Sequence, residues 1–369
     1  MKILVVFVEI TEYNLARIEN VYKRMDGVEF TYIYCAASVS GHKTNRVLPE
    51  NATVLQGGMK EKSRQLKRIL KEGNFDFAII NGYSDILRLQ AISYAKRKHI
   101  PYAIETDTQL NIPGSFLKRN IKKALLKYVF SGNVWGFAGG SRQKALFSHY
   151  GMKPERIRIL PMTVDVERFR QKCAQLPGRE ELKAENDFAG KKVALYVGRF
   201  AEEKNLPILL QAATQLKNKG RDFALCLVGK GEKKAELESF CQQNDLQEQV
   251  RFVDYMLFDR LVAYYKMAEV LVLPSKFEPW GLVVNEALSC GLPVIASQRV
   301  GAVDDLIVPG ENGEVFSWQD AGQLAVQLEN WLYNKTNETM PDVMKNWDHF
   351  TYKKIFSGIL LEIRNEGNN

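Results

Sequence analysis

Short apolar runs of strand length alternate with longer, partly polar segments of helix length along most of this chain. In the first half the apolar runs cover residues 3–8, 30–35, 77–80, 102–104 and 157–160. The alternation starts again at residue 191, with runs at 193–197, 223–228, 250–253, 270–273 and 293–296. Consecutive parallel strands need helical crossovers, so this pattern predicts parallel sheets covered by helices on both faces. We therefore predict an α/β fold made of two doubly wound domains.

The alternation is interrupted between residues 163 and 189, where a Pro-Gly pair and a charged stretch occur. A chain of 369 residues is also long for one domain. We predict an N-terminal domain over residues 1–165 and a C-terminal domain over residues 166–345.

The last segment, residues 346–366, has the apolar spacing of a helix, with Phe356, Ile359, Leu360 and Ile363 on one face. Periodicity leaves two alternatives open. The helix either returns to pack on the first domain or ends the second one.

Composition excludes several classes of protein. The chain is 46% hydrophobic and 25% charged, which is typical of a globular protein and not of a disordered one. No apolar run reaches the roughly 18 residues of a membrane-spanning helix. The first residues reach Glu9 and Glu12 without a cleavage signal, so we expect a buried first strand and a cytoplasmic protein. The five cysteines include no C-x-x-C pair, which favours reduced thiols over a metal or disulfide framework.

Charge is distributed unevenly. Residues 1–170 carry a net charge of +13 and residues 171–369 a net charge of −5, within a total of +8. A basic first half indicates that this half contacts an anionic surface or ligand.

The densest cluster of ligand-binding features lies at residues 274–288, after a predicted buried strand and at the start of a helix. Gly281 allows close backbone approach, and the free N–H groups at a helix start attract anions. Glu278 and Glu286 flank this point and could bind hydroxyl groups. The alternative is an ordinary turn with a solvated loop acid and a charge on the helix surface.

A second cluster, at residues 198–205, follows the first strand of the second domain and contains Arg199 and Lys204. A guanidinium and an ammonium group together suit a diphosphate. The alternative is a solvated charged turn. The turn at residues 228–231 is only G-x-G, so it fails as a dinucleotide fingerprint.

Taken together, these motifs resemble the retaining GT-B glycosyltransferases of family 4. The matching residues are E-P-W-G-L-x-x-x-E at 278–286, G-R-F-x-x-E-K-N at 198–205, V-G-K-G at 228–231 and G-L-P-V-I-A-S at 291–297. They occur in the family's usual order between about residues 156 and 316. Over residues 1–155 the resemblance rests on the strand–helix pattern.

The resemblance implies two Rossmann-like domains facing across a cleft, with a nucleotide-activated sugar held by the second. Arg199 and Lys204 would neutralise the donor diphosphate, and Glu278 would bind hydroxyls of the transferred sugar. The other donor-binding residues that it implies are Gly229, Tyr255, Met256, Leu257, Gly281, Leu282, Val283 and Glu286.

The resemblance also implies the type of chemistry. Retention in this family is described as a front-face substitution, in which the leaving phosphate takes the acceptor's proton. Such a reaction depends on electrostatic stabilisation of the leaving group. The sequence has no D-x-D triplet and its four His residues are dispersed, so we expect no metal and no cofactor besides the donor substrate.

The acceptor side departs from the family pattern. Residues 9–14 lack the glycine-rich loop, and Glu105, Thr106 and Asp107 stand where members often have a His-Asp pair. We predict that Asp107 is a catalytic residue that orients an acceptor or donor hydroxyl. The alternative is a turn or helix-capping Asp.

A basic amphipathic segment occupies residues 117–128, with Leu117, Ile121, Leu125 and Tyr128 along one face. Such a helix is typical of binding to an anionic membrane surface, and residues 60–71, with six basic side chains, could add to it. The alternative is a solvated helix whose apolar face is buried. Nucleic acid is not expected, because the basic runs lack interleaved aromatic residues.

These observations predict a retaining glycosyltransferase of the hexosyltransferase type, peripheral on the inner face of the cell membrane. It would move a sugar from a nucleoside diphosphate to a lipid-linked or surface glycan acceptor. Two alternatives remain: a catalytically silent sugar-nucleotide-binding protein, and a sugar-nucleotide epimerase or hydrolase on the same scaffold.

Overall fold

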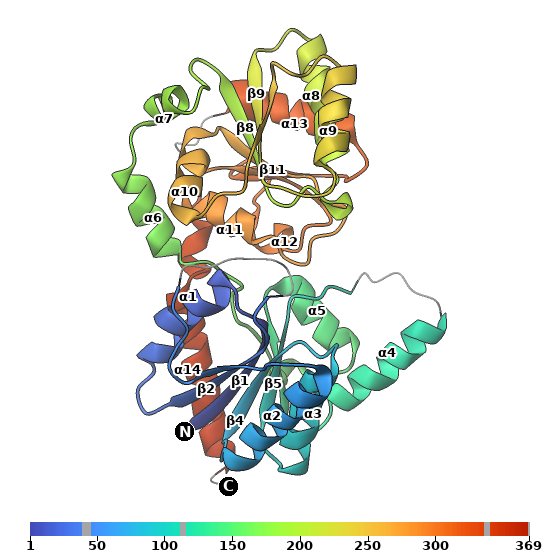
Figure 1. Ribbon diagram of the computed structural model, residues 1–369, viewed down its shortest axis with the longest axis vertical. Coiled ribbons are helices and arrows are strands. Elements are labelled where there is room, and N and C mark those ends of the chain that lie inside the picture. Colours follow the sequence, from blue (N-terminus) through green and yellow to red (C-terminus); the bar gives the residue numbers. More distant parts are fainter. Residues whose placement is uncertain (39–45, 111–115, 336–339, 368–369) are drawn as a thin grey trace. The chain divides into compact units, whose positions relative to one another are not determined.

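The chain forms two compact units, each built on one parallel sheet (Figure 1). This computed structural model describes all residues except 39–45, 111–115, 336–339 and 368–369, and the side chains of 116–121 and 367. The first unit comprises Met1–Asp165 and Trp347–Asn369, and the second comprises Val166–Asn346. Within the described ranges, no helix combines the length and the apolar composition needed to cross a bilayer.

The first unit contains a seven-stranded sheet in which every pair of neighbours is parallel. In spatial order the strands are β3 (Ala52–Val54), β2 (Glu29–Ala36), β1 (Lys2–Glu9), β4 (Phe77–Asn81), β5 (Tyr102–Thr106), β6 (Val134–Ala138) and β7 (Ile157–Ile159). Strand β1 lies inside the sheet, where Val5 is paired with Tyr32 of β2 on one side and Ile79 of β4 on the other.

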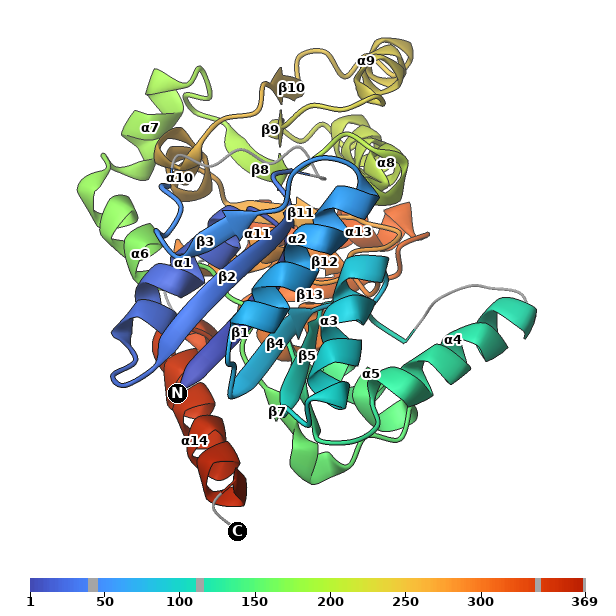
Figure 2. The ribbon, with the colours of Figure 1, turned by 60° about the horizontal axis from the view of Figure 1, so that its bottom comes forward.

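Helices cover both faces of this sheet (Figure 2). The helices of the unit are α1 (Glu12–Asn20), α2 (Met59–Glu72), α3 (Ile86–Arg97), α4 (Phe116–Val129), α5 (Ser141–His149) and α14 (His349–Gly367), with short 3-10 turns η1 (Tyr22–Arg24) and η2 (Pro154–Arg156). Successive side chains of a strand point to opposite faces, which gives two cores. Leu4 and Val6 pack with α2, α3 and α4, whereas Ile3 and Val5 pack with α1 and α14.

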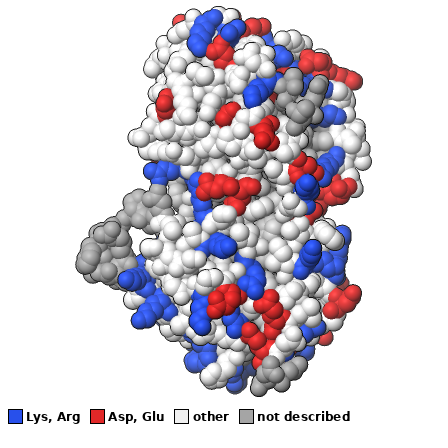
Figure 3. Space-filling view, turned by 180° about the vertical axis from the view of Figure 1, so that it is seen from behind, with Lys and Arg blue, Asp and Glu red and all other residues white. Residues whose placement is uncertain are grey.

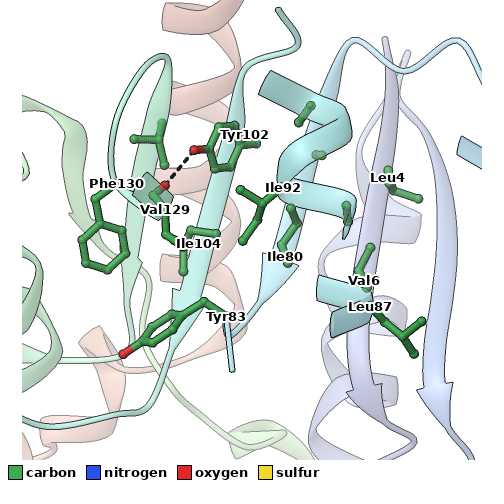
Figure 4. Packing of buried hydrophobic residues seen from close by; sticks show 14 of the residues in the cluster. Leu4, Val6, Ile80, Tyr83, Leu87, Ile92, Tyr102, Ile104, Val129 and Phe130 are labelled. Atoms are coloured by element: carbon green, nitrogen blue, oxygen red, sulfur yellow. Dashed lines mark hydrogen bonds between the residues drawn. The ribbon is translucent and has the colours of Figure 1, made fainter. Parts of the chain in front are cut away.

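Figure 4 shows the core beneath α3 and α4, where Ile92 packs beside Ile104 and the Tyr102 hydroxyl donates to the Val129 carbonyl at 2.7 Å. This bond ties the end of α4 to β5. Among the described side chains of α4, the buried ones are Leu126 and Val129.

The apolar face named for residues 117–128 is not the face that α4 buries in the core over its described half. Leu125 is only partly buried and Tyr128 is 45% exposed, whereas Leu126 and Val129 are buried. The side chains of Leu117 and Ile121 lie outside the described residues.

The C-terminal helix α14 packs on the first unit. Tyr352, Phe356 and Ile359 are buried in the same core as β1 and α1. Glu362 forms an ion pair with Arg158 at 3.0 Å, near the end of the helix.

The second unit contains a six-stranded parallel sheet. In spatial order its strands are β10 (Val250–Val253), β9 (Phe223–Val228), β8 (Lys192–Val197), β11 (Val270–Leu273), β12 (Val294–Ser297) and β13 (Gly313–Phe316). In both sheets the chain starts in the middle, builds outward to one side and then crosses to the other. This is the strand order of a doubly wound fold.

Two groups of helices flank this second sheet. One group is α6 (Val166–Gln175), α7 (Arg179–Glu185), α10 (Phe258–Met267) and α11 (Leu282–Ser289), and the other is α8 (Leu206–Asn218), α9 (Lys234–Gln243) and α13 (Ala321–Tyr333). The shorter turns are η3 (Glu202–Lys204), α12 (Val303–Leu306) and η4 (Val343–Asn346).

The predicted α/β class and doubly wound sheets are confirmed, but three strands were not predicted. Strands β3 and β13 are short edge strands, and β6 contains Gly136 in its centre. The two edge strands are too short to give a clear apolar run, and the glycine interrupts the run of β6.

A buried ion pair joins helix α1 to strand β5 in the first unit. Arg17 is fully buried and donates to the Glu105 carboxylate, which is 6% exposed. Arg17 also donates to the Tyr13 hydroxyl at 3.2 Å and contacts the Tyr352 hydroxyl of α14 at 3.4 Å. Asn81 of β4 donates to the second Glu105 oxygen at 3.0 Å. Burial alone would lower the pKa of Arg17, but the charge of Glu105 raises it well above its usual value.

We expect Glu105→Gln to destabilise the first unit strongly. The substitution leaves a buried guanidinium without its counter-charge, which typically costs about 3–5 kcal/mol. Urea unfolding followed by circular dichroism measures the change. Glu19→Gln is the matched control, because Glu19 pairs with Lys23 on the surface and such pairs contribute little. Equal midpoints for the two variants would contradict the structural role of the Arg17 pair.

Candidate functional site

Two loops of the second unit meet at the carboxyl edge of its sheet. The loop after β8 covers residues 198–205, and the loop after β11 covers residues 274–281. Strands β8 and β11 are neighbours, and the strand order reverses between them. Ligands of doubly wound sheets bind at such a reversal, outside the carboxyl ends of the strands.

The structure brings two of the predicted catalytic residues together at this point. The Lys204 ammonium, at the end of η3, donates to the Glu278 carboxylate in the loop after β11. The two side chains are 15% and 14% exposed, so the pair is largely enclosed but reachable. The Ser275 hydroxyl lies 3.5 Å from the same carboxylate oxygen.

Asn205 and Ser297 fix these loops. Asn205 has a left-handed backbone, with φ 56°, and its amide donates to the carbonyls of Pro274 at 3.1 Å and Trp318 at 2.9 Å. Ser297, at the end of β12, donates to the Ser275 carbonyl at 2.5 Å. The Lys204–Glu278 pair therefore sits on loops that are hydrogen-bonded to each other.

Helix α11 begins at the same place. Its N-cap, Gly281, has φ 96°, and a Cβ there would lie 3.1 Å from both the Leu273 and Val300 side chains. The N–H groups of Leu282 and Val283 belong to the first turn, where an α-helix offers no carbonyl partner of its own. Because these N–H groups point out of the start of the helix, where the helix dipole is positive, they favour a bound anion next to Lys204 and Glu278.

Arg199 does not join the pair in this structure. Its side chain is 59% exposed and donates to Glu203 at 2.5 Å. The backbone of Arg199 is held more firmly than its side chain, because the buried Tyr196 hydroxyl donates to the Arg199 carbonyl at 2.8 Å. The guanidinium can therefore swing from Glu203 to a ligand while its main chain stays in place.

Glu286, in α11, accepts a hydrogen bond from the Tyr265 hydroxyl of α10 at 2.5 Å. Tyr265 is buried, and burial together with the charge of Glu286 raises its pKa far above the usual value. The phenol thus stays protonated and holds one carboxylate oxygen. No motif in the sequence marked Tyr265, because its role depends on the packing of α10 against α11.

Four of the predicted donor-binding residues follow the ends of β9 and β10, namely Gly229, Tyr255, Met256 and Leu257. A Cβ at Gly229 would come within 1.9 Å of the Gly198 carbonyl oxygen, so the turns after β8 and β9 are packed backbone to backbone. After β10, Tyr255 and Leu257 are 47% and 42% exposed, while Met256 is buried. The side chains of Tyr255 and Leu257 can therefore contact a ligand, whereas that of Met256 is packed in the interior.

Asp107 belongs to the first unit and follows β5. It is exposed, and its backbone carbonyl accepts from the Gln143 side chain at 2.9 Å. Two residues earlier, the Glu105 carboxylate is enclosed by Arg17 and Asn81. Of the two carboxylates at Glu105 and Asp107, that of Asp107 is therefore the one that a ligand can reach.

Within the described residues, no group of three or more His, Cys, Asp or Glu side chains is placed to bind a metal ion.

The comparisons with known proteins include one family model that falls in the second unit. Residues 178–348 match the family model described as glycosyl transferases group 1. The alpha-D-kanosaminyltransferase of Streptomyces kanamyceticus is 31% identical over 154 residues, 42% of this chain and 40% of that protein. The D-inositol 3-phosphate glycosyltransferase 2 of Catenulispora acidiphila is 32% identical over 192 residues, 50% of this chain and 44% of that protein. The chain thus aligns with less than half the length of these two relatives.

Solved structures resemble the chain over nearly its whole length. HepE of Anabaena, solved in complex with UDP, has a TM-score of 0.75 and 15% identity, covering 98% of this chain and 100% of that chain. The two parallel-sheet domains and this likeness confirm the predicted GT-B fold. At this identity the likeness concerns the fold alone.

Proposed function

We propose that the chain is a glycosyltransferase whose second unit binds a nucleoside diphosphate sugar. The observation that carries the proposal is the Lys204–Glu278 pair beside the start of α11. Lys204 and the first-turn N–H groups offer positive charge for a diphosphate, and Glu278 offers an acceptor for sugar hydroxyls. The match of residues 178–348 to glycosyl transferases group 1 supports this interpretation of the same segment.

The reaction that fits this site is transfer of a hexosyl group with retention. As the bond between the sugar and the diphosphate breaks, negative charge grows on the leaving phosphate. Lys204, the N–H groups of Leu282 and Val283, and Arg199 after it leaves Glu203 would stabilise that charge. The leaving phosphate oxygen would take the proton of the acceptor hydroxyl, which Asp107 would orient, so the step needs neither a metal nor a carboxylate nucleophile.

Other residues of the second unit would bind the ribose and the base of the nucleotide. Glu286, held on one oxygen by Tyr265, would accept from the ribose hydroxyls with its other oxygen. Tyr255 and Leu257 would lie against the base, near the glycine turn at Gly229. UDP is the first nucleotide to test, since HepE was solved with UDP and with UDP-glucose.

We expect Lys204→Ala to lower donor turnover by roughly 10²–10³-fold, because one charge that stabilises the leaving phosphate is lost. Donor turnover is measured as the release of nucleoside diphosphate from a panel of UDP-, GDP- and ADP-sugars. Lys219→Ala is the control, since Lys219 pairs with Glu329 on the surface of the same unit.

The same assay separates the alternatives. Equal turnover in Lys204→Ala and the parent protein contradicts the donor site. Binding of a nucleotide sugar that is recovered unchanged indicates a silent binding protein, and recovery of its epimer without release of nucleoside diphosphate indicates an epimerase. Release that an added lipid-linked glycan never accelerates indicates a hydrolase.

We also propose that the first unit docks on the anionic inner face of a membrane and receives a lipid-linked or surface glycan acceptor there. Helices α2, α3 and α4 cover one face of its sheet, and α4 extends away from the sheet in both ribbon views (Figures 1 and 2). Basic side chains stand on the outer sides of α2 and α4, namely Lys60, Arg64, Lys67, Arg68, Lys71, Lys123 and Lys127. The reverse view, in Figure 3, shows Lys and Arg interspersed with Asp and Glu. Each basic residue near anionic lipid contributes about 1 kcal/mol.

We expect the protein to sediment with vesicles that contain phosphatidylglycerol and to be released above ~0.5 M salt, where screening is strong. Replacing Lys123 and Lys127 by Glu should weaken this binding. The control replaces Lys219 and Lys234, which are basic residues of the second unit, in the same way. Equal binding to neutral vesicles contradicts the proposed docking face.

A further inference from the structure

A buried hydrogen bond spans the turn at which α11 begins. The indole N–H of Trp280 donates to the Oδ1 atom of Asn285 at 2.8 Å. Trp280 is 2% exposed and Asn285 is fully buried. The proposed reaction gives neither side chain a role, although both lie in the segment that carries Glu278 and Glu286. Such a bond fixes local geometry, because breaking it leaves a buried polar group with one hydrogen bond fewer.

The bond closes a ring around a glycine. Trp280 precedes the N-cap Gly281, and Asn285 is the fourth residue of α11. The N–H groups of Leu282 and Val283 therefore lie between the two bonded residues along the chain. Glycine populates many backbone conformations, so a turn made at Gly281 with φ 96° needs contacts that select one of them. The Trp280–Asn285 bond is such a contact, because it links the residue before the glycine to the helix that follows.

The loop before the glycine is itself anchored. The Trp280 carbonyl accepts a hydrogen bond from the Ala302 N–H at 3.0 Å. The Glu278 carbonyl accepts one from the Gly301 N–H, also at 3.0 Å. Both donors follow β12, so the end of this loop is fixed to the segment after the neighbouring strand. Through Asn285, the side chain of Trp280 carries this anchorage to α11.

We propose that the Trp280–Asn285 bond positions the diphosphate subsite, an inference that rests on the proposed function. By joining the anchored loop to α11, the bond keeps the Leu282 and Val283 N–H groups aimed at one point beside the Glu278 carboxylate. N–H groups that are oriented before the ligand arrives need no reordering on binding, so they stabilise phosphate charge more strongly. Both side chains of the pair are buried, so they act through the turn and are positioning residues.

Two substitutions break the bond while removing little volume. Trp280→Phe keeps an aromatic ring but removes the N–H donor, and Asn285→Leu keeps the branched shape but removes the acceptor oxygen. Trp331→Phe is the matched control, because Trp331 of α13 is also 2% exposed and lies in the same unit. Its indole N–H has no hydrogen-bond partner among the described residues, so the control loses ring volume but no hydrogen bond.

The first test follows amide hydrogen exchange of the full chain by mass spectrometry. We expect the peptide that covers residues 281–289 to exchange roughly tenfold faster in Trp280→Phe, because the start of α11 opens more often. Trp331→Phe should leave that peptide at the wild-type rate. Equal exchange of this peptide in Trp280→Phe and Trp331→Phe overturns the proposal.

The second test measures the affinities for UDP and for uridine by ligand-observed NMR. We expect the UDP affinity to fall roughly tenfold in Trp280→Phe and in Asn285→Leu. The uridine affinity should stay constant, because uridine carries no phosphate. The double variant should bind UDP no more weakly than the worse single variant, since both substitutions break the same bond.

Three results of this second test overturn the positioning role: an unchanged UDP affinity, equal losses for UDP and uridine, or losses that add in the double variant. A merely structural role predicts the second of these, because general loosening of the unit weakens both ligands. If wild-type protein binds no UDP, the proposed function fails, while the exchange measurement still decides whether the bond orders the turn.

Discussion

The parallel direction of the described strands is the constraint on which the rest of the structure depends. Parallel strands place all their carboxyl ends at one edge, so loops that follow different strands gather there. In the second unit this brings Lys204, after β8, to Glu278, after β11, although 74 positions separate them in the sequence. Helix α11 starts from the same loop, so its N–H groups point to the same place. The chemistry proposed here needs a cation, a carboxylate and a helix start within reach of one ligand, and this edge supplies all three.

Much of the fold was predictable because strands buried on both faces appear as continuous apolar runs. The runs that became β1, β9 and β11 are of this kind. The missed strand β6 reads Val-Trp-Gly-Phe-Ala, and its central glycine weakened the signal. In α4 the sequence showed an apolar stripe through Leu125 and Tyr128, but it could not show which positions the core buries. The structure buries Leu126 and Val129, which lie one residue later.

The candidate site was predictable only as far as its motifs extend along the chain. Lys204, Glu278 and Gly281 stand in strand-to-helix turns, where ligand-binding residues are expected, and the first two do meet. The partner of Arg199, the αL backbone of Asn205 and the hydrogen bond from Tyr265 to Glu286 could not be read from the sequence. The first two depend on the conformation of one loop, and the third joins two helices whose spacing in the sequence carries no periodic signal.

If the second unit binds a nucleoside diphosphate as proposed, the diphosphate lies at the start of α11. A crystal structure of the chain soaked with UDP would show it there. We expect phosphate oxygens within about 2.7–3.2 Å of the Leu282 or Val283 N–H groups and of the Lys204 ammonium. We also expect the ribose hydroxyls to bind Glu286. UDP bound with its phosphates away from α11, or bound only to the first unit, would contradict the proposed donor site.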